Sequence, residues 1–244
     1  MIRSKKALVA LTIVFFVIEA SLGVLLQAAQ SHIAINLRYT AIIMAVVFGI
    51  VLAEKSLSCL LTEIALVATL AADYFLVYLS EMKQLPAMLF FSVVHITYFL
   101  RLYHEDKKPS RRITRLALHP SLSLAMLGVT LAVLGENADA LSLVSMFCYI
   151  NLILNTVFAM ITFRQNSLLA IGLLLFLLCD TVIGLIFLKA YLPISPESLI
   201  YTVLYPGFDL AWAFYLPAQT LLAISLLPKR LGKRKIEWTS SPAA

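Results

Sequence analysis

The sequence predicts an all-α, polytopic membrane protein with eight transmembrane helices. Hydrophobic residues make up 61% of its 244 residues and charged residues only 13%, against roughly 45–50% and about 25% in soluble domains. The mean hydropathy is +0.94 over the whole chain. Because a spanning helix needs about 20 apolar residues, eight helices and short loops use up the length. We therefore expect one transmembrane domain over 1–228, followed by a basic cytoplasmic tail over 229–244.

Apolar runs separated by polar residues place the expected helices. The ranges are 7–28, 37–53, 57–79, 84–103, 119–135, 141–163, 167–189 and 204–227. The first run follows Arg3, Lys5 and Lys6, as in a signal peptide, but no convincing cleavage site follows. We interpret it as the first membrane helix, with a cleaved signal peptide as the alternative. Pro120 suits the first turn of the fifth helix, and Pro217 should kink the last one.

The lysines and arginines are distributed unequally between the two sides. With a cytoplasmic N-terminus, all but three of the 19 basic residues face the cytoplasm, many of them in a basic loop over 104–118; the exceptions are Arg38, Lys83 and Lys189. Cytoplasmic loops are enriched in Lys and Arg, so this distribution predicts that both termini lie on the cytoplasmic side. We expect the membrane to be a bacterial-type cell membrane. The net charge of +6 is thus an orientation signal, and no nucleic-acid partner is expected.

The two halves of the chain carry similar motifs. Leu-Ala-Ala-Asp73 aligns with Leu-Leu-Cys-Asp180, and Phe-Ser-Val-Val-His95 aligns with Tyr-Leu-Pro-Ala-Gln219. The aligned spans are four apart and run in the same direction, which is typical of a parallel repeat. The sequence thus indicates a 4+4 repeat; the alternative is that any two apolar helices look alike.

Polar residues inside the spans are the candidates for function. A charge at mid-bilayer costs about 2.5–3.5 kcal/mol on insertion scales, and such residues usually face a cavity or a partner. The candidates are Glu19, Glu63, Asp73, His95, Asn151, Asn155, Asp180, Asp209 and Gln219. Several of them from different helices share one depth, which predicts a common internal cavity. Alternatively, His95 is a satisfied interhelical hydrogen-bonding residue, and the two asparagines hold helices together.

No metal or organic cofactor is expected. The three cysteines lie in or beside apolar segments, so neither a disulfide framework nor a cysteine-based zinc site is indicated. Of the four histidines only His95 is mid-span. The sequence also lacks the serine-hydrolase elbow, the zinc-protease motif and a phosphate-binding glycine loop.

Four short motifs resemble the YhhN family of membrane proteins, which includes the lysoplasmalogenases. The corresponding stretches are Leu-Ala-Ala-Asp73, His95-Ile-Thr-Tyr98, Phe176-Leu-Leu-Cys-Asp180 and Phe214-Tyr215-Leu-Pro-Ala-Gln219. Their order and their helices agree with the family pattern over most of the chain. Alanine replaces the family's glycine before Asp73, and cysteine replaces its serine before Asp180. The family's Lys-Pro in the second span is absent; Arg38 is a candidate for the missing cation, or merely flanks its helix.

The resemblance implies hydrolysis of the vinyl ether bond of a lysophospholipid-like substrate within the bilayer. Asp73 and Asp180 would be the catalytic pair, with His95 orienting one of them. The expected substrate-binding residues are Glu19, Arg38, Tyr98, Asn155, Tyr215 and Gln219. A small transporter or lipid-binding membrane protein with a protonatable carboxylate pair is the alternative, because mid-membrane acids fit transport equally well. A purely structural membrane subunit would leave the buried acids unexplained. The sequence indicates no particular oligomeric state.

Overall fold

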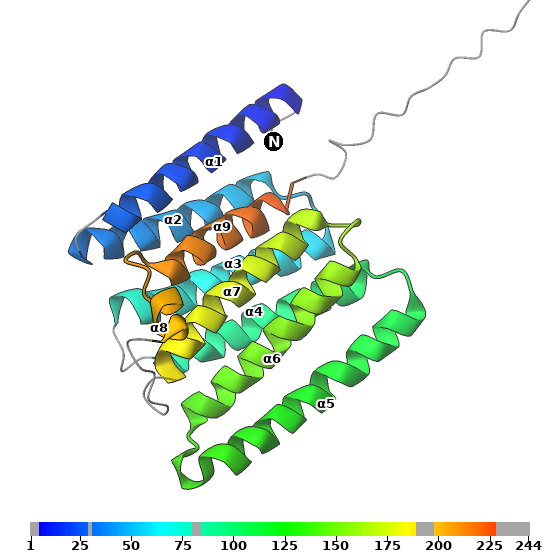
Figure 1. Ribbon diagram of the computed structural model, residues 1–244. Helices are drawn as coiled ribbons and strands as arrows, with labels where there is room; N and C mark the ends of the chain where they lie inside the picture. The colour runs from blue at the N-terminus through cyan, green and yellow to red at the C-terminus, as the bar shows by residue number, and fades with distance from the viewer. Residues whose placement is uncertain (1–4, 29–30, 80–83, 189–197, 228–244) are drawn as a thin grey trace, which may run out of the picture.

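The computed structural model describes residues 5–28, 31–79, 84–188 and 198–227 (Figure 1). Lys83, Lys189 and the tail over 229–244 lie outside them. The helices are α1 (Lys5–Ala28), α2 (Ser31–Leu52), α3 (Leu57–Asp73) with a π-helical turn (Tyr74–Tyr78), α4 (Gln84–Glu105), α5 (Pro109–Leu134) with a 3₁₀ turn (Gly135–Asn137), α6 (Ala140–Ile161), α7 (Ser167–Leu188), α8 (Leu199–Leu204) and α9 (Leu210–Ile224). No strand occurs in these ranges.

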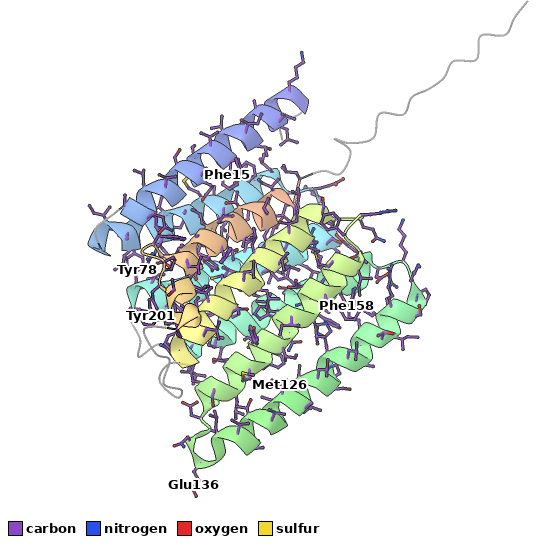
Figure 2. All side chains as sticks on the ribbon, in the orientation of Figure 1. Phe15, Tyr78, Met126, Glu136, Phe158 and Tyr201 are labelled. Atoms are coloured by element: carbon purple, nitrogen blue, oxygen red, sulfur yellow. The ribbon has the colours of Figure 1, made fainter. Side chains whose placement is uncertain are left out.

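The described chain is an all-α polytopic membrane protein. Its first seven long helices, α1 to α7, are each long and apolar enough to cross a bilayer, and α9 is a shorter apolar helix of 15 residues. Large apolar side chains are exposed, for example Val51 at 68% and Val133 at 75%. Figure 2 shows the side chains that project outward from the helices. A surface of this kind suits lipid, in which backbone polar groups must be paired inside helices.

The helices form two layers (Figure 1). One contains α2, α3 and α4, and the other contains α9, α7 and α6. The layers meet where α2 packs on α9 and where α4 packs on α6, while α1 and α5 cover opposite edges. The tightest pairs are α3 with α4 and α7 with α9. These four helices carry most of the predicted site residues.

Local sequence explains where several helices begin. The Ser56 hydroxyl accepts a hydrogen bond from the Cys59 N–H at 3.2 Å and caps α3. Asp139 caps α6 in a reciprocal pair with Ser142. Asp209 caps α9 by accepting from the Trp212 N–H at 3.2 Å. Side-chain oxygens at these positions satisfy backbone donors that have no partner within the helix.

Three expected boundaries were wrong. The second helix begins at Ser31 rather than 37, which places Arg38 inside α2. The fifth begins at Pro109 instead of 119, so Pro120 lies within the helix; Pro109 takes the first-turn position, where a missing N–H costs nothing. The last helix, expected from 204, begins at Leu210 in α9, and a separate short helix, α8, ends at Leu204. Gly207 lies between the two helices with a φ of 87°, a backbone conformation that favours glycine.

Candidate functional site

Asp73 is the last residue of α3, immediately before the π-helical turn. Single π-helical turns occur frequently at functional sites. The Asp73 side chain is buried at 3% exposure. It accepts a hydrogen bond of 2.6 Å from the hydroxyl of Tyr215 on α9. A carboxyl group inside the bundle is thus held in position by a residue from the opposite layer.

Asp180, on α7, is partly exposed. It lies within electrostatic range of both Asp73 and Tyr215. No hydrogen bond joins its carboxyl group to another residue in the described ranges. The structure therefore brings the two predicted aspartates into one neighbourhood, in which Asp73 has a hydrogen-bond donor and Asp180 has none among the described residues.

Aromatic rings connect His95 to this pair. The His95 ring lies 5.9 Å from the Phe176 ring, whose centroid is 5.6 Å from that of Tyr215. His95 is 1% exposed, and neither ring nitrogen has a hydrogen-bond partner among the residues described. The Asn155 amide donates to the His95 backbone carbonyl at 2.9 Å, which fixes α6 against α4 beside the ring.

Further buried polar atoms without described partners lie within a helical turn of these residues. They are Thr69 Oγ1, Tyr98 Oη, Asn155 Oδ1 and both side-chain polar atoms of Gln219. Thr69 is four residues before Asp73, and Gln219 is four residues after Tyr215. Each buried polar group left unpaired costs about 1–3 kcal/mol. A group of them indicates a place where water or a ligand completes the hydrogen bonding.

Asn151 differs from Asn155. Its amide donates to the Ser123 hydroxyl at 2.9 Å and to the Phe147 carbonyl, and its oxygen pairs with the His119 ring at 2.8 Å. These bonds join α5 to α6. Asn151 is therefore the interhelical packing residue that the alternative interpretation described.

Arg38 lies on α2 and forms an ion pair with Asp209. Its guanidinium is also 5.1 Å from the centroid of the Trp212 ring, a cation–π geometry. The Trp212 ring lies edge-on to Tyr215 at 5.1 Å, so two aromatic rings separate the cation from Asp73. The predicted cation is therefore near the site, but it already has an anionic partner.

Glu19 is 2% exposed and faces α9 from α1. It lines a cavity with residues on the α1-facing side of α9, whereas Tyr215 reaches Asp73 of α3. The structure thus brings Asp73, His95, Tyr98, Asn155, Asp180, Tyr215 and Gln219 toward one region and places Glu19 in another.

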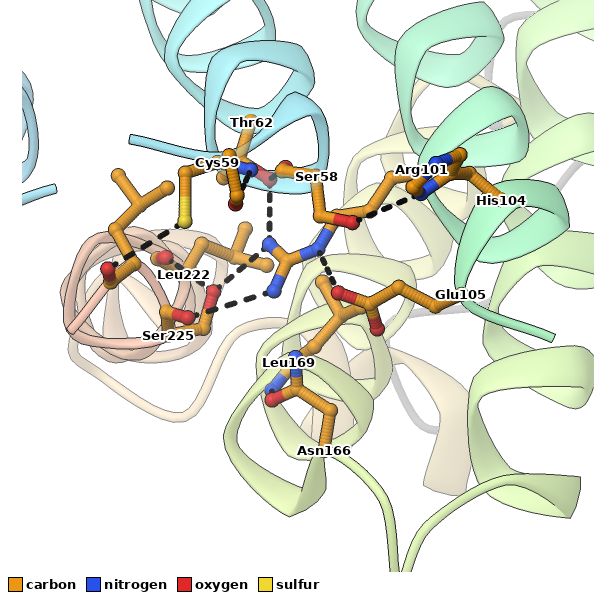
Figure 3. A network of polar contacts seen from close by, with 12 residues as sticks. Ser58, Cys59, Thr62, Arg101, His104, Glu105, Asn166, Leu169, Leu222 and Ser225 are labelled. Atoms are coloured by element: carbon orange, nitrogen blue, oxygen red, sulfur yellow. Dashed lines mark hydrogen bonds and ion pairs between the residues drawn. The ribbon is translucent and has the colours of Figure 1, made fainter. Parts of the chain in front are cut away.

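A buried arginine was not recognised from the sequence. Arg101 was counted among the basic residues expected on the cytoplasmic side, but its side chain is buried within α4 at 1% exposure. Its guanidinium donates to the Thr62 hydroxyl and, at 3.0 Å, to the Ser225 hydroxyl (Figure 3). Glu105 supplies an anionic partner at 3.4 Å. Thr62 near the start of α3 and Ser225 just after the end of α9 were the available signal, because both fall on the same side of the bundle as Arg101. The network joins α3, α4 and α9 one turn from Tyr98.

Asp106 lies in the connection between α4 and α5. Its carboxylate contacts the N-cap residue of α5 and two arginines within that helix. It accepts from the Lys108 N–H at 3.0 Å and from the Arg111 guanidinium at 2.8 Å, and Arg115 lies 3.5 Å away. Burial would raise the pKa of Asp106, but these hydrogen bonds and the charges of both arginines lower it below its ordinary value. Arg115 is also buried, 4.5 Å from the centroid of the Phe158 ring.

Within the described ranges, no group of three or more His, Cys, Asp or Glu residues is placed to hold a metal ion. The cysteines are buried and form no disulfide bond; they are Cys59, Cys148 and Cys179. Comparison with known proteins found no matching family model, no matching curated protein and no matching solved structure.

Proposed function

We propose that this protein is a membrane hydrolase that cleaves the vinyl ether bond of a lysoplasmalogen-type lipid. The observation that carries the proposal is the pair of neighbouring aspartates inside an apolar bundle, surrounded by buried polar groups without partners. The four motifs that resemble the YhhN family support the same assignment. A lipid substrate also accounts for the position of the pair within membrane-spanning helices.

The first chemical step needs an acid. A vinyl ether is hydrolysed by protonation of the carbon remote from oxygen, which leaves an oxocarbenium ion. We assign the proton to Asp180, because its carboxyl group is partly exposed and has no described hydrogen-bond partner. Asp73 accepts the Tyr215 hydroxyl, an arrangement suited to an ionised carboxylate. Its negative charge would stabilise the cation as that cation forms.

The second step consumes one water molecule. Asp180, now ionised, takes a proton from the water that attacks the oxocarbenium carbon, and a hemiacetal results. The hemiacetal then breaks into a fatty aldehyde and a glycerophospho-alcohol, and both aspartates are restored. This sequence requires no metal and no organic cofactor.

Substrate contacts follow from the surrounding residues. The unpaired groups of His95, Tyr98, Asn155 and Gln219 offer hydrogen bonds near the aspartates. Arg38 would bind the substrate phosphate, for which it would exchange its ion pair with Asp209. The apolar chain would lie between helices, in contact with rings such as Phe176.

The topology belongs to the same proposal. We infer eight crossings, with α9 as the eighth, and both termini in the cytoplasm. The helices of the two halves have matching neighbours: α3 with α4 corresponds to α7 with α9, and α2 against α9 corresponds to α6 against α4. This correspondence supports a parallel 4+4 repeat, which would place Asp73 and Asp180 in equivalent helices.

Aldehyde release tests the proposal. Purified protein in detergent, with no ion gradient, should convert lysoplasmalogen to aldehyde in proportion to enzyme concentration. The saturated ether analogue is the substrate control, because it cannot be protonated to an oxocarbenium ion in this way. The transporter alternative has the same acids in its favour. Absence of aldehyde from every vinyl ether lipid tried, together with proton-dependent uptake in vesicles, would establish that alternative instead.

A further inference from the structure

A cavity of about 290 Å³ lies between α1 and α9. Its wall is mostly apolar, and its polar side chains include Glu19, Gln27 and Thr220. The α9 residues that line it, among them Ala213 and Pro217, lie on the side facing α1. Protein pockets for small ligands start at about 300 Å³, so this cavity has room for no more than one hydrocarbon chain with a small polar group.

Glu19 has no partner in this cavity. Its side chain is 2% exposed, and neither carboxyl oxygen has a hydrogen-bond partner in the part of the chain that the structure describes. Lys6 is the nearest preceding basic residue whose side chain is described. It lies about 20 Å from Glu19 along α1, since an α-helix rises about 1.5 Å per residue. Arg38, beyond Trp212, is paired with Asp209. A buried ionised carboxylate without a partner is costly, so a bound cation would stabilise this group.

Among the groups that line the cavity, more hydrogen-bond acceptors than donors are available to a ligand. Pro217 has no N–H, so the Ala213 carbonyl lacks its usual helical donor. The Thr220 hydroxyl already donates to the Leu216 carbonyl at 2.8 Å. The Gln27 amide donates to the Asp209 carbonyl at 3.1 Å. A ligand that complements two carboxyl oxygens and a carbonyl without its i+4 helical donor needs several donors and a positive charge. A primary ammonium group has three N–H donors.

We propose that this cavity binds the primary ammonium group of an amphiphile together with one of its hydrocarbon chains. The ammonium group would pair with Glu19 and donate to the Ala213 carbonyl, and the hydrocarbon chain would lie along the apolar wall. The amine could come from a free long-chain amine or from the amino headgroup of a membrane phospholipid. The site is independent of the vinyl ether chemistry proposed for Asp73 and Asp180.

Native mass spectrometry of the full-length protein tests this site. We expect dodecylamine to remain bound at least ten times better than dodecyltrimethylammonium, which has the charge without N–H donors, or dodecanol, which has no charge. Glu19→Gln should reduce dodecylamine retention at least tenfold. Equal retention of the three probes, or unchanged retention in Glu19→Gln, would overturn the proposal.

A matched pair of substitutions controls for folding. Ala20 lines the cavity, and Ala10 is exposed on the same helix outside it. Ala20→Phe should fill the cavity and abolish retention, whereas Ala10→Phe should bind as the wild type does; similar binding by both would contradict the assigned location. A second experiment distinguishes a free amine from a phospholipid headgroup as the source of the ammonium group. Protein is released from nanodiscs of phosphatidylethanolamine or phosphatidylcholine, and its bound molecules are identified by native mass spectrometry. Glu19-dependent retention of phosphatidylethanolamine identifies the lipid, and retention of dodecylamine alone identifies the free amine.

Discussion

Asp73 and Asp180 perform different tasks in the proposed reaction, so neither should replace the other. Asp73→Asn and Asp180→Asn should each lower aldehyde release by at least ~10²-fold, the lower end of what a positioned acid or base contributes. Asparagine keeps the volume, so expression and melting temperature should stay near those of the wild type. His95→Gln should cost less, because His95 is assigned a supporting role. Full activity in either aspartate variant would exclude the pair mechanism.

Tyr215 is a positioning residue, since its hydroxyl holds Asp73. Tyr215→Phe should reduce kcat about tenfold to a hundredfold, because a hydrogen bond to a charged group is worth about 1.5–3 kcal/mol. KM should change little. Tyr149→Phe is the matched control: it removes another hydroxyl that is hydrogen-bonded between α6 and α7, at 3.0 Å to Thr181. Equal losses in the two variants would mean that Tyr215 acts only through helix packing.

Single residues were predictable from the sequence where their cost in lipid is high. Asp73, Asp180 and His95 stand out in apolar spans for that reason. Their partners did not, because Tyr215 and Asp73 are 142 positions apart and a tyrosine in a membrane helix is not itself unusual. The identity of Tyr98 and Tyr215 as site residues came from motif resemblance alone. The pairing of Arg38 with Asp209 likewise depends on how α2 meets α9.

Helices were predictable from apolar length, but their ends were not. The first turns of α5 contain Arg111, Arg112 and Arg115 and give no apolar signal, although arginine is a good helix former. The structure shows why they are helical: Asp106 pairs with Arg111 and Arg115 across the preceding loop. In the last segment, Gly207 and Asp209 separate two helices in a way that hydropathy alone does not register.

The loop between α4 and α5 should give the protein an acid-sensitive element. Because the pKa of Asp106 is lowered in the folded state, its ionised carboxylate stabilises the fold at pH values above the ordinary pKa of 3.8. This stabilisation is lost as the pH falls through the lower, folded-state pKa. Asp106→Asn should therefore reduce the free energy of unfolding at pH 7 by about 1.5–3 kcal/mol. The difference from wild type should shrink below pH 3.8. Thermal unfolding in detergent measures it, with exposed Glu136→Gln as control; a difference independent of pH would refute the assignment.

Arg38 has two candidate roles: it can bind the substrate phosphate, or it can join α2 to α9 through its ion pair with Asp209. Arg38→Gln should raise KM for a phosphate-bearing substrate while leaving the folded yield nearly intact. Asp209→Asn should lower that KM, because it frees the cation for the substrate. If KM is unchanged in both variants, the ion pair serves only to join the two helices.

At the scale of the whole molecule, the orientation is testable by chemical labelling. Ser110 and Glu136 are exposed near opposite ends of the α5 segment. In intact cells, an impermeant thiol reagent should modify Glu136→Cys and not Ser110→Cys. The native cysteines are buried and should contribute little background. Modification at 110 but not at 136 would reverse the proposed topology.

The arginine network at the end of α4 has a consequence for biosynthesis. Arg101 enters the membrane long before Ser225 is made, yet Ser225 supplies two of its hydrogen bonds. Until α9 arrives, the guanidinium needs water in place of these two acceptors, because a buried polar group left without a partner costs about 1–3 kcal/mol and a charged one costs more. We therefore expect the preceding helices to form an insertion intermediate that is still open to water at that end. Insertion of α9 would then be the event that seals this end of the bundle.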